Sequence, residues 1–176
     1  MTLPRLLLLA SALAVLSACA TQRKPPPAPV PRPAPAPVVV APPPPADWRD
    51  AAITPGSWSY GPTVAGTRAA FAPGTAEPLL TLACQQGARQ LVLSRAGAAS
   101  GTVPLTVTTT TLVRSFSAAP DASGAQRLNV SLAARDPLLD ALAFSRGRFM
   151  VEAPGLPTLY LPAWPEVGRV IEDCRR

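Results

Sequence analysis

The stretch "PLLTLACQQGARQLVLSR", residues 78–95, contains two apolar runs on either side of a polar segment with one glycine. Each run, 78–84 and 89–95, has the length and the mixture of apolar and β-branched residues that β-strands favour. The segment "QQG" between them is typical of a turn. The stretch therefore predicts two successive antiparallel strands, with Cys84 at the end of the first.

The same pattern continues on both sides of this stretch. Turn-forming segments such as "AGAASG" (96–101) and "PDASG" (120–124) separate further short apolar runs. Leu128, Val130 and Leu132 alternate with more polar residues, which predicts one buried and one wetter face. We expect additional strands at 58–60, 67–72, 103–117 and 127–133.

The long threonine-rich run, 103–117, does not keep one alternation throughout. Leu105 and Val107 occupy odd positions, whereas Leu112 and Phe116 occupy even positions. A single strand cannot place both sets on the same face, because successive side chains point to opposite faces. We therefore predict a β-bulge or a break near residues 109–111.

Two short helices are expected in the second half of the chain. Asp136 followed by Pro137 is typical of a helix N-cap and first position, and Gly147 ends that helix. The second helix covers 165–174 and would carry Glu166, Arg169 and Asp173 on its outer side. The residues expected to be buried are Leu138, Leu139 and Leu142 in the first helix, and Val167, Val170, Ile171 and Cys174 in the second.

A β-hairpin is expected between the helices, turning around residues 154–157. Its inward-facing residues would be Phe149, Val151, Leu159 and Leu161. Together these elements predict one domain, 47–176, that is mainly β: a small antiparallel β-sandwich or rolled sheet with two short α-helices.

The N-terminus has the features of a secretory signal. Arg5 is followed by an apolar stretch, 6–16, which is too short to span a bilayer. Leu16, Ser17, Ala18 and Cys19 then resemble the bacterial lipobox at all four positions. The resemblance implies a lipoprotein signal peptide (1–18), cut before a Cys19 that carries acyl chains.

The alternative at the N-terminus is an ordinary signal peptide, cleaved at Ala18 or Ala20, with a free Cys19. In the lipoprotein class an Asp after the cysteine commonly retains the protein in the inner membrane, but this chain has Ala20. The resemblance therefore favours an anchor in the outer membrane, facing the periplasm. Several acyl chains make such anchoring persistent.

The segment after Cys19, residues 19–46, is a Pro-rich linker. From 25 to 46 it is almost only Pro, Ala and Val, a composition that favours polyproline II and cannot form a core. We expect a disordered tether that reaches on the order of 70 Å when fully extended. The alternative is a ligand for a Pro-recognising module or a guide through the cell-wall mesh.

Charge and composition exclude several functions. Four of the 16 basic residues precede position 47, whereas all 10 acidic residues lie at position 47 or after it, so the domain carries only about +2 of the formal charge of +6. No basic stripe with aromatic residues is present, which argues against nucleic acid as a partner. The domain contains neither His nor Lys, so the commonest general base, metal ligand and amine nucleophile are missing. We expect no cofactor and no metal.

Two cysteines, Cys84 and Cys174, remain once Cys19 is lipidated. In an oxidising periplasm such a pair is expected to form a disulfide, and no His is present to activate a thiolate. The helical phase places Cys174 on the buried side, which suits a bond to a strand cysteine. We expect this disulfide to be structural.

The order of "LLTLAC", "RQLVLSR", a long strand, "LAFSRGRFMVE" and "LPTLYLPAWPEVGRVIEDCRR" resembles a group of α-proteobacterial lipoproteins with no known activity. More distantly, one early and one terminal cysteine around a β-sandwich is similar to the invasion-associated locus B family and to an accessory protein family of type VI secretion. These resemblances imply a lipid-anchored β-sandwich and carry no active-site motif.

A charge cluster after the first predicted helix consists of Arg146, Arg148 and Glu152, next to Gly147. Two arginines beside a glycine turn could clamp a carboxylate or phosphate of peptidoglycan or lipopolysaccharide. The alternative is a solvated strand face opposite Phe149.

Aromatic residues offer another candidate surface. Trp58, Tyr60 and Trp164 could line a sugar-binding surface, or they could be core and rim aromatics.

The function hypothesis is a non-catalytic periplasmic domain that binds an envelope protein or peptidoglycan. The alternative is an envelope hydrolase that uses carboxylates such as Asp136, Asp140 or Glu152.

Overall fold

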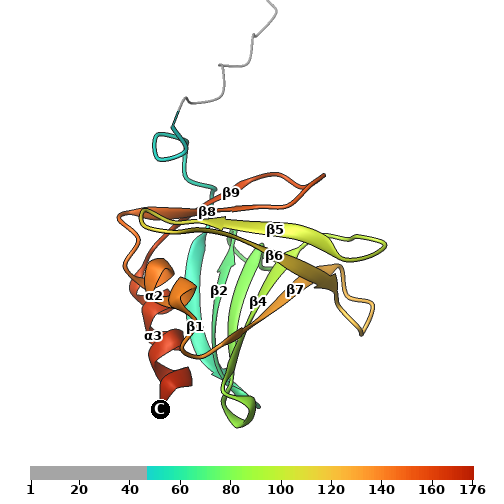
Figure 1. The fold of residues 1–176 in the computed structure, drawn as a ribbon, viewed down its shortest axis with the longest axis vertical. Coiled ribbons are helices and arrows are strands. Elements are labelled where there is room, and N and C mark those ends of the chain that lie inside the picture. The colour runs from blue at the N-terminus through green and yellow to red at the C-terminus, as the bar shows by residue number, and fades with distance from the viewer. Residues whose placement is uncertain (1–46) are drawn as a thin grey trace, which may run out of the picture. The chain divides into compact units, whose positions relative to one another are not determined.

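The computed structural model describes residues 47–176; the expected signal peptide, Cys19 and the linker lie outside this range. Within it, nine strands form one antiparallel sheet in the order β1-β2-β3-β4-β7-β6-β5-β8-β9, with two α-helices and a short 3-10 helix (Figure 1). The mainly β fold with two short helices is therefore confirmed. The elements are β1 (Ser57–Thr63), β2 (Gly66–Ala72), β3 (Leu80–Gln85), η1 (Gln86–Ala88), β4 (Gln90–Ala96), β5 (Val103–Thr108), β6 (Val113–Pro120), β7 (Arg127–Ala133), α2 (Pro137–Ala143), β8 (Arg148–Glu152), β9 (Leu159–Pro162) and α3 (Pro165–Arg175).

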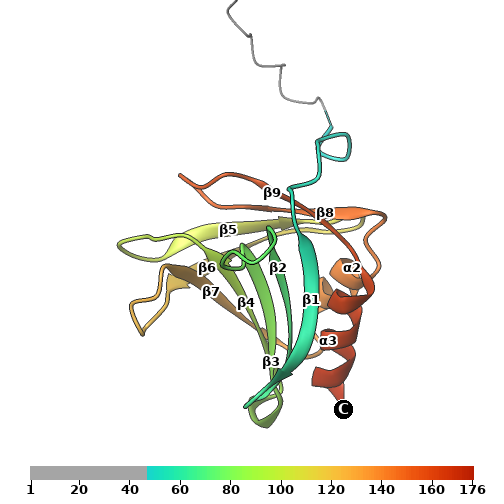
Figure 2. The ribbon, with the colours of Figure 1, turned by 180° about the vertical axis from the view of Figure 1, so that it is seen from behind.

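The sheet is rolled rather than flat, and the bend lies at β6. This strand pairs with β5 from Val113 to Ala118, but with β7 only through Ala119 and Pro120. The layer of β5, β8 and β9 consequently crosses over the strands β1, β2, β3, β4 and β7 (Figures 1 and 2). Of the two predicted architectures, the structure has the rolled sheet.

The two outermost strands of this sheet approach each other. The indole Nε1 of Trp58 on β1 donates a hydrogen bond to the carbonyl of Pro162 on β9, at 2.8 Å. Just before β1, Thr54 exchanges hydrogen bonds with Tyr160 of β9: its amide donates to the Tyr160 carbonyl, and its hydroxyl accepts from the Tyr160 amide. These contacts hold the rolled sheet nearly closed on itself.

The helices cover the side of the sheet that the roll leaves open. Helix α3 packs against β1, β2, β3 and β4, and α2 packs against α3 (Figure 1). The described range contains no helix that is long and apolar enough to cross a membrane. The residues predicted to be buried on the two helices are buried: Leu138, Leu139, Leu142, Val167, Val170, Ile171 and Cys174.

The sulfur atoms of Cys84 on β3 and Cys174 on α3 lie 2.12 Å apart, at disulfide bonding distance. The strand cysteine is fully buried because it alternates in phase with Leu80 and Leu82. The helix cysteine is buried because it follows Ile171 on the same side of α3. The predicted pairing therefore joins the last turn of the helix to the sheet beneath it.

The alternation predicted for β7 is confirmed, since Leu128, Val130 and Leu132 are buried between more exposed neighbours. The predicted hairpin is also present as β8 and β9, with all four of its expected inward residues buried. Both strands lie over the core formed by β1 to β4 and β7. Sequence alternation was sufficient here because each strand has one face in the core.

The break predicted in the threonine run is confirmed, and it reverses the chain. β5 ends at Thr108 and β6 begins at Val113, and the two strands pair in antiparallel fashion. The hydroxyl of Thr109 accepts hydrogen bonds from the amides of Thr111 and Leu112 and donates to the Leu112 carbonyl. A threonine side chain therefore stabilises a turn that contains neither glycine nor proline.

The predicted outer face of α3 is only partly correct, because Arg169 is exposed but Glu166 and Asp173 are half-buried. Glu166 and Arg169 were expected on the outer side together with Asp173, but the Asp173 carboxylate turns back to the sheet. It accepts hydrogen bonds from the hydroxyls of Tyr60 on β1 and Thr67 on β2. The helical pattern could not show these strand hydroxyls, which satisfy a half-buried carboxylate beside the apolar face.

Candidate functional site

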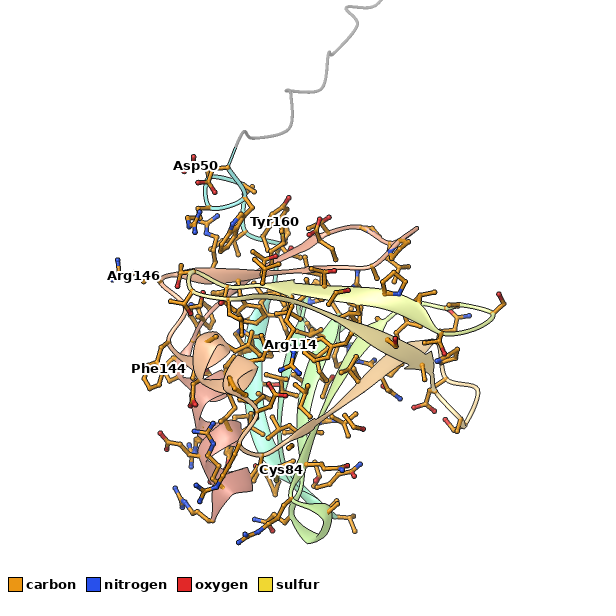
Figure 3. The ribbon with its side chains drawn as sticks, viewed as in Figure 1. Asp50, Cys84, Arg114, Phe144, Arg146 and Tyr160 are labelled. Carbon is orange, nitrogen blue, oxygen red and sulfur yellow. A yellow bond between two sulfur atoms is a disulfide. The ribbon has the colours of Figure 1, made fainter. Side chains whose placement is uncertain are left out.

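Arg146, the exposed arginine of the predicted charge cluster, lines a depression of about 420 Å³. The other residues around it are Arg49, Thr110 and Thr111. They come from three parts of the chain: the segment before β1, the turn between β5 and β6, and the loop between α2 and β8. Figure 3 shows Arg146 at the same end of the domain as Asp50, where the described range begins.

Hydrogen bonds between the two loops fix the shape of this depression. The hydroxyl of Ser145 accepts from the amide of Thr110 at 3.2 Å and donates to the carbonyl of Arg148 at 2.6 Å. The amide of Arg146 donates to the hydroxyl of Thr110 at 3.2 Å. Gly147, with φ of 76°, then allows the chain to turn into β8. The backbone that carries Arg146 is therefore held before any ligand binds.

Arg148 does not share this depression. Its side chain is half-buried and donates a hydrogen bond to the carbonyl of Ala51, on the segment before β1. The structure thus brings Arg146 together with Arg49 rather than with Arg148. Arg148 instead ties β8 to the N-terminal segment, which positions Arg49.

Arg49 is exposed and has a local carboxylate partner. Its guanidinium lies 3.2 Å from Asp47 and 4.8 Å from the centre of the Trp48 ring. The backbone amide of Arg49 also donates to Asp47, and this hydrogen bond is the main cause that lowers the pKa of Asp47. The depression is therefore lined by two guanidinium groups, and with the ionised Asp47 beside Arg49 the net charge of these three groups at neutral pH is positive.

The chemistry of these groups suits an oxyanion. A guanidinium presents paired N–H donors that match a carboxylate or phosphate, and threonine hydroxyls add donors from the side. Arg49 and Arg146 both line the depression and could both contact such a group. The composition of this depression therefore suits an anion.

The three aromatic residues proposed as a sugar surface do not form one. Trp58 is 6% exposed and packs in the core against Phe71 and Phe149, with ring centres 5.4 and 6.3 Å away. Tyr60 lies under the guanidinium of Arg169, 4.2 Å from its ring centre. Trp164, directly before α3, is the one exposed residue of the three, and a single exposed ring does not make a surface. The alternative prediction, core and rim aromatics, describes these side chains.

The candidate catalytic carboxylates do not share one set of contacts. Asp136 caps α2 and forms an ion pair with Arg114 at 2.7 Å, and Asp140 forms one with Arg175 at 2.8 Å. Glu152 lines a different depression beside β5. Residues 47–176 contain no group of three His, Cys, Asp or Glu side chains that could hold a metal ion.

Sequence reasoning found Arg146 but missed Arg49 and the threonine hydroxyls. Arg49 belongs to the short segment between the linker and the first strand, and no periodic pattern links it to position 146. The threonine run predicted a break, yet nothing in it showed which loop the break would contact.

The chain matches no protein-family model, and no curated protein or solved structure is significantly similar to it.

Proposed function

We propose that this chain is a lipoprotein anchored in the outer membrane, whose domain in the periplasm binds an anionic envelope component without catalysis. The location rests on the lipobox resemblance of residues 16–19. The Pro-rich linker would separate the domain from the lipid headgroups by up to the order of 70 Å. Such a protein would present its domain to a component beyond the membrane surface.

The observation that carries the binding role is the pair of Arg49 and Arg146 over the threonine turn. We propose peptidoglycan as the ligand class, because its peptide stems carry carboxylates and an extended tether would let the domain reach beyond the membrane surface. A hydrolase is less well supported, since Asp136 and Asp140 are both engaged by arginines. Glycosidase chemistry requires two carboxylates that are free to act on the scissile bond.

Binding can be tested with the domain 47–176 and isolated peptidoglycan in a sedimentation assay. We expect the wild-type domain to sediment with the polymer at low salt and less at high salt, because exposed ion pairs are screened. The double variant Arg49→Ala, Arg146→Ala should lose most of this binding. The matched control is Arg68→Ala, which removes an exposed arginine on β2. Equal binding by the double variant and the control would contradict the proposal.

Anchoring can be tested separately with Cys19→Ser in the full chain. The lipid, and no part of the domain, supplies membrane affinity in this proposal. We therefore expect the variant to fold but to leave the membrane fraction, and to incorporate no labelled fatty acid. A variant that still pellets with the outer membrane would show that the lipobox assignment is wrong or that another anchor exists.

A further inference from the structure

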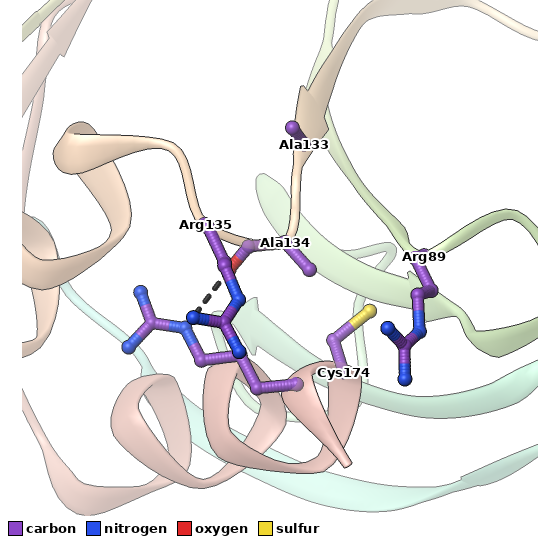
Figure 4. A pocket seen from close by; sticks show the side chains of 6 residues that line it. Arg89, Ala133, Ala134, Arg135 and Cys174 are labelled. Atoms are coloured by element: carbon purple, nitrogen blue, oxygen red, sulfur yellow. Dashed lines mark hydrogen bonds between the residues drawn. The ribbon is translucent and has the colours of Figure 1, made fainter.

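A second arginine-lined depression lies beside the disulfide. It has a volume of about 230 Å³ and is lined by Arg89, Arg135 and Arg175, with Ala133, Ala134 and Cys174 between them (Figure 4). Figure 3 places Cys84, the partner of Cys174, toward the opposite end of the domain from Arg146. The two arginine-lined depressions are therefore separate.

The three arginines come from three elements that the fold brings together. Arg89 follows η1, Arg135 lies between β7 and α2, and Arg175 is the last residue of α3. Arg175 is already fixed: its Nε donates to the carbonyl of Ala134 at 2.8 Å, and its Nη1 donates to Asp140 at 2.8 Å. The preceding residue, Cys174, is linked to β3. The side of the depression that Arg175 forms is therefore ordered in the absence of a ligand.

Arg89 occupies a backbone conformation that normally belongs to glycine. Its φ is 51° and its ψ is 47°, and it is the one residue other than glycine with positive φ in the described range. The turn requires this conformation, because the Arg89 amide donates to Gln86 and its carbonyl accepts from Ala134. Glycine would make both hydrogen bonds with less steric strain. The turn therefore does not explain why an arginine side chain stands there.

The charges of this depression do not balance. Asp140 pairs with Arg175, whereas the salt bridges within residues 47–176 involve neither Arg89 nor Arg135. Both of these arginines are exposed. The other residues that line the depression are two alanines and the buried Cys174, whose small side chains leave space for a ligand and offer the arginines no carboxylate. Three guanidinium groups against one carboxylate give a net charge of about +2.

We propose that Arg89, Arg135 and Arg175 form a binding site for a phosphate monoester or inorganic phosphate. A phosphate group carries a charge of about −1.5 to −2 at neutral pH and has three acceptor oxygens, so it matches three guanidinium groups with a net charge of about +2. A carboxylate would leave one positive charge uncompensated. The cavity has room for several waters at about 30 Å³ each, and therefore for one phosphate group. This inference is independent of the peptidoglycan site.

The test is calorimetric titration of inorganic phosphate into the full chain, purified in neutral detergent at low salt. The decisive variant is Arg89→Gly, because it removes the guanidinium while relieving the positive φ. We expect its phosphate affinity to fall about tenfold, with a Tm within about 3 °C of the wild-type value or above it. Arg135→Ala should weaken binding similarly, and Arg146→Ala, at the other depression, should not.

A second arm distinguishes the two sources of phosphate. Vesicles that contain a lipid with a phosphate monoester headgroup are offered, without detergent, to the domain 47–176 of the same variants in a flotation assay, because the acyl chains expected on Cys19 would bind any vesicle. Vesicle binding that is lost in Arg89→Gly identifies a lipid headgroup, and phosphate binding without vesicle binding identifies a soluble compound. The proposal is overturned if phosphate does not bind saturably, or if Arg89→Gly and Arg135→Ala both bind it as the wild type does.

Discussion

The indole of Trp58, on the first strand of the sheet, donates a hydrogen bond to the carbonyl of Pro162, on the last strand. The two edges of a nine-stranded sheet are thereby linked by one side chain. Trp58 also packs against Phe71 from β2 and Phe149 from β8, so the same residue joins both layers of the rolled sheet. The edges of open sheets are sites of unwanted pairing, and bringing them together protects them.

Replacing Trp58 by Phe should therefore destabilise the domain by about 2 kcal/mol, because the Pro162 carbonyl loses its donor and the ring leaves a gap. Urea unfolding followed by circular dichroism measures the change. The control is Trp164→Phe, at a position that is 45% exposed, where we expect a change within about 0.5 kcal/mol. Equal effects of the two substitutions would show that Trp58 does not hold the edges together.

Asp173 gives the domain a predictable response to acid. The hydrogen bond from Tyr60 is the main cause that lowers the pKa of Asp173, and Thr67, Arg176 and Arg169 act in the same direction against partial burial. The folded state therefore favours the ionised carboxylate more than the unfolded chain does. This contribution is fully present above the unfolded pKa of about 4 and is lost as the pH falls through the lower folded pKa.

Tyr60→Phe should lower the unfolding free energy at pH 7 by about 1 kcal/mol, and should flatten its decline below about pH 4. Urea unfolding at a series of pH values from 2.5 to 7 tests both effects. Tyr160→Phe is the matched control, since Tyr160 contacts Thr54 through its backbone and not Asp173 through its hydroxyl. An unchanged acid slope in Tyr60→Phe would contradict the assignment.

Asp136 combines a helix cap with an ion pair, and the two can be separated. Its carboxylate accepts from the amide of Leu138 at 2.9 Å and pairs with Arg114. Asp136→Ala should cost about 1.5 kcal/mol, because both are lost. Asp136→Asn keeps a cap and should cost less than about 1 kcal/mol. A larger loss in the Asn variant would mean that the ion pair, rather than the cap, is the main contribution.

The elements of this fold were largely predictable because each strand or helix has one face in the core. The spacing of Val167, Val170, Ile171 and Cys174 identified the buried side of α3, and the parity change in the threonine run located the turn. The order of the strands was not predictable. Nothing in the local pattern places β7 beside β4 or β8 beside β5, since these pairings depend on contacts between distant segments.

The candidate sites were predictable only in part, for a related reason. Arg146 could be singled out because charges cluster around it in the sequence. Arg49, Arg89 and Arg135 have no other arginine within five residues in the sequence, and they acquire arginine neighbours only when loops meet. Exposed loop residues have no periodicity that fixes their direction, so their convergence is a property of the tertiary structure.

The disulfide between Cys84 and Cys174 should contribute a large share of the stability of the domain. It closes a loop whose ends are separated by 90 residues, for which the chain-entropy model gives about 4 to 5 kcal/mol. The variant Cys84→Ala, Cys174→Ala should therefore melt at a clearly lower temperature than the wild type. In this variant, amide hydrogen exchange should accelerate most in the last turn of α3, because the disulfide ties this turn to β3 in the wild type.

Thiol labelling provides the direct check. When the domain 47–176 is unfolded without a reductant, a thiol reagent should label neither cysteine. After reduction, the same reagent should label both. Reduction of the folded wild-type domain should reproduce the lower Tm of the double variant, whereas the double variant itself should not respond to the reductant. Two labelled thiols in the unreduced protein, or a Tm that reduction leaves unchanged, would mean that burial of Cys174 on α3, and not a covalent bond, holds the helix to the sheet.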